Sequence, residues 1–256
     1  ISRLADLGVS LFRVNLSHTP IVDLRNTIDF IQNLTSVPIC LDTEGAQIRN
    51  GPLEGGKVVL NEHVTVRAAK LNHPGNVDCF GFYPEFVVDQ LEIGDFISID
   101  FNAVLLQVIK RNGSEIIMRV LNGGVIGQNK AVTVERPIEL PPLTDKDREA
   151  IAIGLDKGIG HFALSFANSG ANVDLIRNLC GSDSFIISKI ESRNALINLN
   201  EITRSSDAVL IDRGDLSREV PIEIIPIIQR HVIRNSNTIG TPVYVATNLL
   251  ESMITQ

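Results

Sequence analysis

The sequence predicts an α/β fold that is interrupted by a small all-β domain. Apolar runs of strand length alternate with segments of helical periodicity, which is typical of a parallel sheet covered by helices. Residues 50–138 break this alternation with short strand-like runs rich in Val, Ile and Gly. We therefore expect residues 1–49 and 139–256 to form an incomplete (β/α)₈ TIM barrel of about six βα units, and residues 50–138 to form an inserted small all-β barrel domain.

The barrel segments follow one another along the chain. Strands are expected at residues 9–16, 37–42, 161–166, 185–190, 208–212 and 242–246. Helices are expected at residues 20–34, 145–159, 194–206 and 221–237, with a last one after residue 246. A complete barrel takes about 250 residues, so we expect roughly two further βα units, one before and one after this sequence. In such barrels the functional groups gather at the carboxyl ends of the strands.

The inserted block has the sequence marks of antiparallel β structure. Its apolar runs cover residues 58–69, 95–109, 114–126 and 130–140. The stretches EIGD, at residues 92–95, and KRNGSE, at residues 110–115, carry the glycine signals of tight turns. We predict a β-domain that leaves the barrel after its second visible strand and serves as a lid.

Composition excludes several classes of protein. The chain is 44% hydrophobic and has a formal net charge of −7 without a long basic run, which argues against a nucleic-acid partner. No apolar run in the sequence is long enough to span a membrane. Cys40, Cys79 and Cys180 are odd in number and lack metal-ligand spacing, so we expect free thiols in a reducing compartment.

The stretch IISKIES, at residues 186–192, ends an apolar run with Lys189 and Glu191 two positions apart. In a strand, side chains at this spacing point to the same side of the sheet. Two opposite charges on an inward face are costly unless something there needs them. One interpretation is a salt bridge at a strand end. The other is a ligand that takes both charges, and the remaining strand ends favour it.

Polar side chains follow the other predicted strands at the same kind of position. Four strands end in the stretches FRVNLSHTP, LDTEGAQIRNG, VLIDRGDLSREVP and VYVATNLLESM. The side chains there that could carry chemistry are Arg13, Asn15, Ser17, Asp42, Thr43, Arg49, Asp215 and Thr247. Each also has a structural interpretation, as a strand-end hydrogen bond, a turn or, for Asp215 and Thr247, a helix N-cap.

Together these residues suit a small phosphorylated anion. Arg13, Arg49 and Lys189 supply positive charge for phosphate oxygens. Backbone N–H groups near Gly214 and Asp215, at the start of a helix-like stretch, can hold a substrate carboxylate. An acidic protein that binds an anion must concentrate positive charge in this way.

Two kinds of cation site can be assembled from the same strand ends. Glu191 and Asp215 offer the hard carboxylate oxygens that are typical of Mg²⁺ sites, where water and substrate complete the coordination. A monovalent cation would neutralise the crowded anions. The oxygens suited to it come from Asn15, Ser17, Asp42 and Thr43.

Several motifs resemble those of the pyruvate kinase family in order and spacing: FRVNLSH, LDTEGAQIR, LPPLTDKD, SKIES, RGDL followed by VP, and ATNLLESM. The inserted block, with LEIGDFISID, matches the family's mobile β-domain in position. The resemblance covers nearly the whole chain. It implies phosphoryl transfer from phosphoenolpyruvate to ADP, giving pyruvate and ATP in the last step of glycolysis, with Mg²⁺ and K⁺ as cofactors. It also implies a cytoplasmic homo-oligomer, a tetramer, and a C-terminal regulatory domain that this sequence lacks.

The resemblance further implies roles for individual residues. Arg13 would contact the transferred phosphoryl group and Lys189 would stabilise its developing charge. Thr247 would lie beside the face where the enolate is protonated. Glu191 and Asp215 match the Mg²⁺ ligands. The K⁺ site matches Asn15, Ser17, Asp42 and Thr43, the substrate site includes Gly214, and the nucleotide side matches Arg13, His18, Arg49 and Lys130.

Several positions depart from the family pattern. Asp212 stands where a small residue, usually alanine, precedes the RGD triplet. At about 4 Å and an effective dielectric constant of about 20, its carboxylate would repel an anionic substrate by roughly 4 kcal/mol, unless it binds the metal or points away. The other departures are Ser217 and Arg218 for a glycine and a small residue, Glu44 and Ala46 for lysine and proline, Gln47 for an acidic residue linked to K⁺ dependence, Asn129 for a nucleotide-contacting lysine, and Asn248 for glutamine.

Two other functions are compatible with the sequence. A non-catalytic paralogue that binds phosphoenolpyruvate or a metal would explain Asp212 and Asn129. A Mg²⁺-dependent lyase acting on 2-oxo acids would also hold its metal with two carboxylates. The inserted β-domain speaks against the lyase, because a lyase has no nucleotide for a lid to cover.

Overall fold

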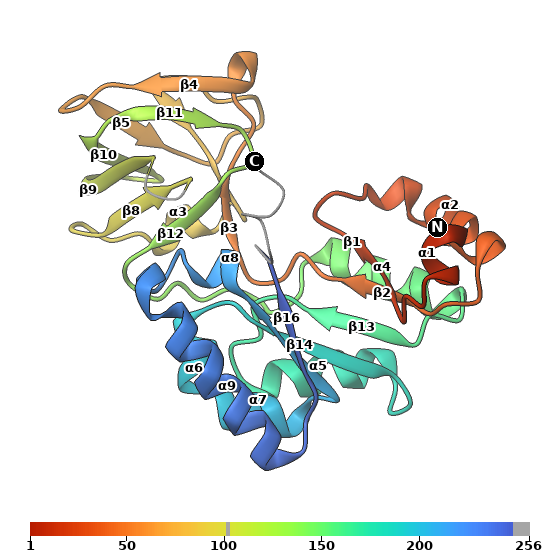
Figure 1. Ribbon diagram of the computed structural model, residues 1–256. Helices are drawn as coiled ribbons and strands as arrows, with labels where there is room; N and C mark the ends of the chain where they lie inside the picture. The colour runs from red at the N-terminus through yellow and green to blue at the C-terminus, as the bar shows by residue number, and fades with distance from the viewer. Residues whose placement is uncertain (101–102, 248–256) are drawn as a thin grey trace, which may run out of the picture. The chain divides into compact units, whose positions relative to one another are not determined.

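The computed structural model describes residues 1–100 and 103–247 (Figure 1). The chain divides into two compact units, which are Ile1–Ala46 together with Pro141–Gln256, and Gln47–Leu140. The boundaries fall two or three residues from the expected ones, at 49/50 and 138/139. The first boundary moves because strand β3 (Ile48–Asn50) pairs with strands of the second unit.

The first unit contains a six-stranded sheet in the order β1-β2-β13-β14-β15-β16, and every neighbouring pair is parallel. Its strands are β1 (Phe12–Asn15), β2 (Ile39–Asp42), β13 (His161–Leu164), β14 (Phe185–Ile190), β15 (Ala208–Asp212) and β16 (Val243–Ala246). Each strand expected from the alternation is present, and the α/β class is confirmed. The described strands form a half-barrel.

Helices connect these strands, as the alternation predicts. They are α1 (Ser2–Asp6), α2 (Ile21–Leu34), α4 (Asp145–Asp156), α5 (Gly170–Cys180), α6 (Arg193–Ile197), α7 (Leu199–Ser205), α8 (Arg213–Leu216), the 3₁₀ turn η2 (Ile222–Ile224) and α9 (Ile225–Ile239). The helix expected from residue 221 thus begins as a 3₁₀ turn. The helix expected after residue 246 falls on residues 248–256, outside the described residues.

The prediction of one helix over residues 194–206 is wrong. Two helices, α6 and α7, meet at Asn198 instead. The Nδ2 group of Asn198 donates to the backbone carbonyl of Asn168 at 2.7 Å. Asn competes in this way for backbone groups, which favours a helix end over a helix interior.

Side-chain caps fix where the helices behind the sheet begin. Thr144 and Asp147 form a capping box at the start of α4, in which each side chain accepts a hydrogen bond from the other residue's backbone N–H. Ser169 and Ser192 cap α5 and α6 through their side-chain oxygens. Such caps each contribute about 1 kcal/mol, and they set where the chain enters each helix after leaving a strand.

One face of the sheet packs against the helices. Four fully buried strand residues point to this face: Leu41, Phe162, Ile186 and Val209. They form one apolar cluster with helix residues such as Leu24. Full burial of a side chain of this size contributes roughly 1.5–3 kcal/mol. This cluster is the main source of stability of the first unit.

The opposite face of the sheet has a small apolar floor. It is formed by Cys40, Ala163, Ile187 and Ala208, which are all buried. Asp42 and Lys189 follow Cys40 and Ile187 by two positions, so they lie on this same face, further along the strands. The inner face therefore changes from apolar to charged toward the carboxyl ends of the strands.

The second unit is largely antiparallel. An eight-stranded sheet has the order β6-β5-β10-β9-β8-β12-β3-β7, and a separate two-stranded ribbon pairs β11 with β4. Besides β3, its elements are η1 (Glu54–Gly56), β4 (Lys57–Leu60), β5 (Thr65–Ala68), β6 (Cys79–Phe80), β7 (Phe82–Tyr83), α3 (Val87–Gln90), β8 (Phe96–Ile99), β9 (Val104–Asn112), β10 (Glu115–Asn122), β11 (Gly124–Gly127) and β12 (Ala131–Val134). The predicted turn in KRNGSE joins β9 to β10, with Gly113 at φ +63°. The unit is mostly β, with the short helix α3 as an addition to the prediction.

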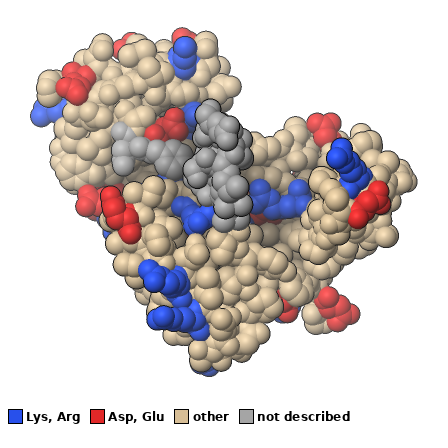
Figure 2. Space-filling model, in the orientation of Figure 1, with Lys and Arg blue, Asp and Glu red and all other residues tan. Residues whose placement is uncertain are grey.

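Charged side chains of both signs lie on the surface, as the composition of the chain predicts. Figure 2 shows acidic and basic side chains spread over the face in view. Among the helices within residues 1–100 and 103–247, none combines the length and the apolar character needed to cross a membrane.

We expect the helix-facing core to dominate the stability of the first unit. Ile186→Ala removes a fully buried side chain and should lower the free energy of unfolding by about 2–5 kcal/mol. The matched control is Ile197→Ala, at a side chain that is 78% exposed, which should change it by less than about 0.5 kcal/mol. Urea unfolding of the complete natural protein measures both. Equal losses in the two variants would contradict the core assignment.

Candidate active site

Charged and polar side chains meet where the first-unit strands end. Asn15 and Asp42 are paired in register at the ends of β1 and β2. Lys189 lies near the end of β14, and Asp212 is the last residue of β15. Because all these strands are parallel, their carboxyl ends share one edge of the sheet, the position where barrel enzymes carry their sites.

A buried ion-pair cluster joins β2 to β14. The Nζ atom of Lys189 lies 2.9 Å from Oε1 of Glu191 and 3.4 Å from Oδ1 of Asp42. All three residues are buried, with exposed fractions of 6%, 0% and 1%. Burial lowers the pKa of Lys189, but the carboxylates of Glu191 and Asp42 outweigh it, so the pKa is raised and the amine stays charged. The salt bridge considered for IISKIES is therefore present, on the inward face of the sheet.

Arg13 reaches the same cluster through Asp42. Its Nη1 atom lies 3.4 Å from Oδ2 of Asp42. Burial raises the pKa of Asp42, while Lys189 and Arg13 oppose that shift. The carboxylate of Asp42 thus contacts two cationic side chains at the carboxyl ends of the strands. Strand pairing brings these residues together, although they are 29 positions or more apart in the chain.

Ser165 belongs to this cluster, although the sequence analysis did not single it out. Its hydroxyl accepts a hydrogen bond from Nζ of Lys189 at 3.1 Å and lies 3.2 Å from Oδ1 of Asp42. Ser165 follows β13 (His161–Leu164) directly, so its place at a strand end was the signal that could have identified it. The cluster therefore has contributions from β1, β2 and β14 and from the residue that follows β13.

Glu191 is the most enclosed carboxylate of the site. Burial raises its pKa to about 7, against the lowering effect of Lys189 and with a further rise from the charge of Asp215. Its Oε2 atom accepts a hydrogen bond from the backbone N–H of Phe166 at 2.8 Å. A raised pKa means that the anionic form gains from any additional cation placed beside it.

Three carboxylates form a candidate metal centre. Oxygens of Glu191, Asp212 and Asp215 lie within 4.8 Å of one another. Hard oxygens at this spacing fit Mg²⁺, which takes one or two carboxylates and completes its shell with water and substrate oxygens. The structure thus brings the two expected ligands together and adds Asp212. Asp215 is also ion-paired with Arg218, whose guanidinium lies 5.7 Å from the ring centre of Phe166.

Asp212 is the hydrogen-bond acceptor for the residues that follow it. Its Oδ1 atom accepts from the backbone N–H groups of Gly214 and Asp215, at 3.1 and 3.4 Å. The hydroxyl of Thr247 donates to the same oxygen at 2.6 Å. Thr247 adopts φ +70°, and its carbonyl accepts from Arg213. The side chain of Asp212 therefore points toward the site, not away from it.

The four residues expected to bind a monovalent cation lie at or near adjacent strand ends, and side-chain oxygens of Asn15, Asp42 and Thr43 have protein partners. Oδ1 of Asn15 accepts from the backbone N–H of Ser17 at 2.9 Å. Oγ1 of Thr43 accepts from the backbone N–H of Ser165 at 3.0 Å. Asp42 contacts cationic side chains, as described above. In this arrangement these groups order the strand ends.

A glycine allows the loop after β2 to approach β13 closely. Gly45 has φ +71°, and a Cβ atom there would lie 2.4 Å from the carbonyl oxygen of Ser165. Both oxygens of the buried Asp147 carboxylate accept from this loop, from the N–H groups of Glu44 at 2.7 Å and Gly45 at 3.1 Å. Lys146 pairs with Glu44 at 2.8 Å. Asp147 and Lys146 were not anticipated from the sequence.

The residues expected on the nucleotide side lie in two different units. His18 is exposed in the first unit. In the second unit, Nη1 of Arg49 donates to the carbonyl of Asn129 at 2.9 Å, and Nζ of Lys130 lies 3.3 Å from Oδ2 of Asp100. Each therefore has its own local environment, and their role in binding a nucleotide stays a prediction.

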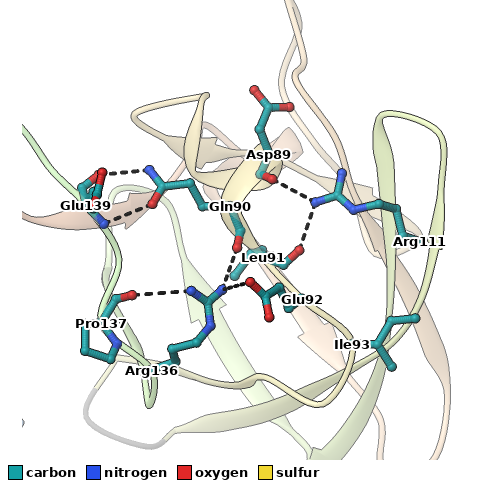
Figure 3. Close-up of a pocket in the computed structure, with 9 residues that line it drawn as sticks. All are labelled: Asp89, Gln90, Leu91, Glu92, Ile93, Arg111, Arg136, Pro137 and Glu139. Atoms are coloured by element: carbon teal, nitrogen blue, oxygen red, sulfur yellow. Dashed lines mark hydrogen bonds and ion pairs between the residues drawn. The ribbon is translucent and has the colours of Figure 1, made fainter.

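An open pocket in the second unit is held together by two arginines (Figure 3). Arg111 donates to the carbonyls of Asp89 and Leu91, at 3.0 and 2.8 Å. Arg136 pairs with Asp95 and donates to the carbonyl of Gln90. Both guanidinium groups thus bind groups of the second unit, and they join α3 and the segment after it to the neighbouring strands.

A model of the pyruvate kinase barrel domain matches residues 1–256. The chain belongs to the pyruvate kinase family. Among curated relatives, the pyruvate kinase of Thermoplasma acidophilum is 32% identical over 99% of this chain and 46% of its own length. The pyruvate kinase of Thermotoga maritima is 34% identical over 99% of this chain and 56% of its own length. Plastidial pyruvate kinase 3 of Arabidopsis thaliana is 33% identical over 99% and 46%.

The same relationship is visible in three dimensions. The crystal structure of a pyruvate kinase from Cryptosporidium parvum superposes with a TM-score of 0.83 at 32% identity, covering 99% of this chain and 55% of that one. The chain spans about half the length of the curated relatives it matches, 46% for the first of those above. The resemblance inferred from the motifs is thereby confirmed at the level of the family.

Two positions expected to depart from the pyruvate kinase pattern lie at the candidate metal centre. Asp212 is one of its three carboxylates, and Arg218 pairs with Asp215. Ser217 donates through its hydroxyl to the carbonyl of Gly214 at 2.7 Å. Asn248 lies outside the described residues. The departures at 212 and 218 therefore bring a new negative charge and a new positive charge to one place.

The close approach at Gly45 can be tested with a matched pair of variants. Gly45 and Gly158 have nearly the same φ, +71° and +73°, but a Cβ atom at Gly158 would meet nothing within 4 Å. Gly158→Ala should cost only the left-handed backbone strain, about 1–2 kcal/mol. Gly45→Ala should cost about 1–3 kcal/mol more because of the clash with Ser165. Urea unfolding of the complete protein measures both, and equal losses would show that the loop does not need the glycine for space.

Proposed function

We propose that the protein containing this chain transfers the phosphoryl group of phosphoenolpyruvate to ADP, giving pyruvate and ATP. The observation that supports this most is the charged cluster at the sheet edge, where the buried Lys189 lies against Asp42 and Glu191 and the exposed Arg13 lies against Asp42. Membership of the pyruvate kinase family gives the second support. The proposal includes a complete eight-stranded barrel, a regulatory domain, a tetrameric assembly and a cytoplasmic location for the whole protein.

In this proposal two cationic residues act on the transferred phosphoryl group. In the reaction the bond between phosphorus and the enol oxygen breaks, and a new bond forms to the terminal phosphate oxygen of ADP. Arg13 would contact the transferred group, and Lys189, which stays charged, would stabilise the charge on its oxygens. The enolate left behind takes a proton at its methylene carbon to become pyruvate, on the side where Thr247 would lie.

Glu191 and Asp215 would hold Mg²⁺, and Asn15, Ser17, Asp42 and Thr43 would hold K⁺. When bound, Mg²⁺ would supply positive charge to the oxygens of the phosphoryl group and the enolate. The carboxylates themselves would orient the cation. Gln47 stands in place of the acidic residue linked to K⁺ dependence, so we expect activity to depend less on K⁺ than on Mg²⁺.

The remaining substrate contacts follow from the family pattern. Gly214 and Asp215 would bind the substrate carboxylate through their N–H groups, together with Thr247. His18, Arg49 and Lys130 would bind ADP. Asn129 removes one cationic contact that the family pattern has there, so nucleotide affinity should be lower than in relatives with lysine.

A catalytically impaired family member is the second candidate. A specific observation favours it: the groups proposed to bind substrate and metal already have partners within the chain, through Asp212 and Arg218. Such a protein would bind its ligands weakly and turn over slowly.

Lys189→Met tests the proposed reaction. Removing a charge aimed at the transferred group should lower kcat by about 10²–10³, as loss of one strong electrostatic contact does in other enzymes. The measurement is coupled ATP formation by the complete protein, with and without Mg²⁺ and K⁺, together with Mn²⁺ binding by electron paramagnetic resonance, which should persist.

Lys157→Met is the matched control, since Lys157 pairs with Asp29 outside the cluster at 2.7 Å. It should leave kcat unchanged. Circular dichroism checks that both variants fold. Full activity in Lys189→Met would remove this lysine from the mechanism, and absence of ATP formation by the wild-type protein would favour the impaired family member.

A further inference from the structure

Two residues that depart from the family pattern act on the two groups expected to bind ligands. Asp212 introduces a carboxylate, and Arg218 introduces a guanidinium. Both side chains are largely enclosed, with exposed fractions of 8% for Asp212 as a residue and 11% for the side chain of Arg218. Buried charges need partners, so the partners of these two residues decide what they do.

Asp212 is the N-cap residue of α8, and its carboxylate also accepts a hydrogen bond from a side chain outside that helix. Two backbone N–H groups, from Gly214 and Asp215, and the hydroxyl of Thr247 all donate to one oxygen, Oδ1. The donors come from two elements, the start of α8 and the end of β16. They are the same donors that the proposed function assigns to the carboxylate of the substrate.

Arg218 is bound as a cation would be. Its Nη2 atom pairs with Oδ1 of Asp215, one of the two proposed Mg²⁺ ligands. Its guanidinium also lies over the ring of Phe166 at 5.7 Å, a distance at which a cation is attracted by the aromatic face. This second contact holds the side chain over the carboxylate cluster.

We propose that Asp212 and Arg218 occupy two of the proposed ligand positions themselves. The carboxylate of Asp212 accepts hydrogen bonds from the donors assigned to the substrate carboxylate. The guanidinium of Arg218 takes the place of the divalent cation at Asp215. The inference rests on the proposed function, because it uses the same substrate and metal positions. Phosphoenolpyruvate and the divalent cation must then displace internal partners before they bind. The intact site has low affinity for both ligands.

An alternative use of Asp212 is as a third metal ligand, since its carboxylate lies within 4.8 Å of those of Glu191 and Asp215. Three hydrogen bonds to Oδ1 already fix the orientation of the group toward backbone and hydroxyl donors. Occupancy of the anion position is the better account of these contacts. Only the use as a third metal ligand predicts that Asp212→Ala binds a divalent cation about tenfold more weakly.

The experiment measures binding of two probes by the complete protein and its variants. Phosphoenolpyruvate binding is measured by isothermal titration calorimetry, and Mn²⁺ binding by electron paramagnetic resonance. Asp212→Ala should lower the dissociation constant of phosphoenolpyruvate about tenfold or more, since three donors are released and a like charge is removed. Arg218→Ala should lower the dissociation constant of Mn²⁺ about fivefold or more, since Asp215 is released.

Matched variants separate occupancy from charge. Asp212→Asn keeps the shape and the accepting oxygen, so it should fold as the wild type does and gain much less phosphoenolpyruvate affinity than Asp212→Ala. An equal gain in both would show that charge alone matters and would overturn internal occupancy. Asp183→Ala and Arg204→Ala, at exposed positions of the first unit, should change neither affinity.

The outcomes also distinguish this inference from the proposed function. Unchanged affinities in Asp212→Ala and Arg218→Ala overturn the inference, even where the protein forms ATP. Weaker Mn²⁺ binding in Asp212→Ala, by about tenfold, overturns it in favour of a third metal ligand. Higher affinities without ATP formation in any variant support the inference and contradict the kinase activity.

Discussion

The charged cluster around Lys189 is the constraint on which the first unit depends. An amine, two carboxylates and a serine hydroxyl are packed where water is nearly absent, between β2, β13 and β14. Desolvation of each ion costs several kcal/mol, and the interaction is favourable only when every charge has a well-placed partner. Removing one partner would leave an isolated buried charge. The strands, the Gly45 loop and the α4 cap must therefore stay in register for the cluster to exist.

Burial of the apolar floor and of the helix-facing core offsets the free energy that desolvation of the charged cluster costs. Small side chains such as Cys40, Ala163 and Ala208 fill the inner face below the charges, and large ones fill the helix side. Strand periodicity of two residues separates these layers without any special loop. A parallel sheet then brings the last polar residue of each strand to one edge. The chemistry of the site follows from the same alternation that forms the core.

Much of this organisation could be predicted from the sequence. The strands, the inserted β-domain and the shared face of Lys189 and Glu191 follow from local patterns. The contacts that fix the site do not. Ser165 lies outside the recognised motifs, and Asp147, although it ends LPPLTDKD, showed no sign of its contact with the Gly45 loop, so their roles arise from strand order and from a loop that only a glycine allows. The helix break at Asn198 depends on a carbonyl 30 residues away. Tertiary partners of this kind cannot be inferred from periodicity or composition.

The departures at positions 212 and 218 are best understood as one change. Asp212 alone would add a negative charge beside Glu191, whose pKa burial already raises to about 7. Arg218 alone would add a positive charge beside Asp215, one of the two proposed Mg²⁺ ligands. Together they leave the charge of the cluster unaltered, and each has partners within the chain. A site that is electrostatically satisfied in this way keeps its geometry without a ligand. The same satisfaction makes any ligand a competitor of the protein's own side chains, so fold stability and ligand affinity are opposed at this point of the molecule.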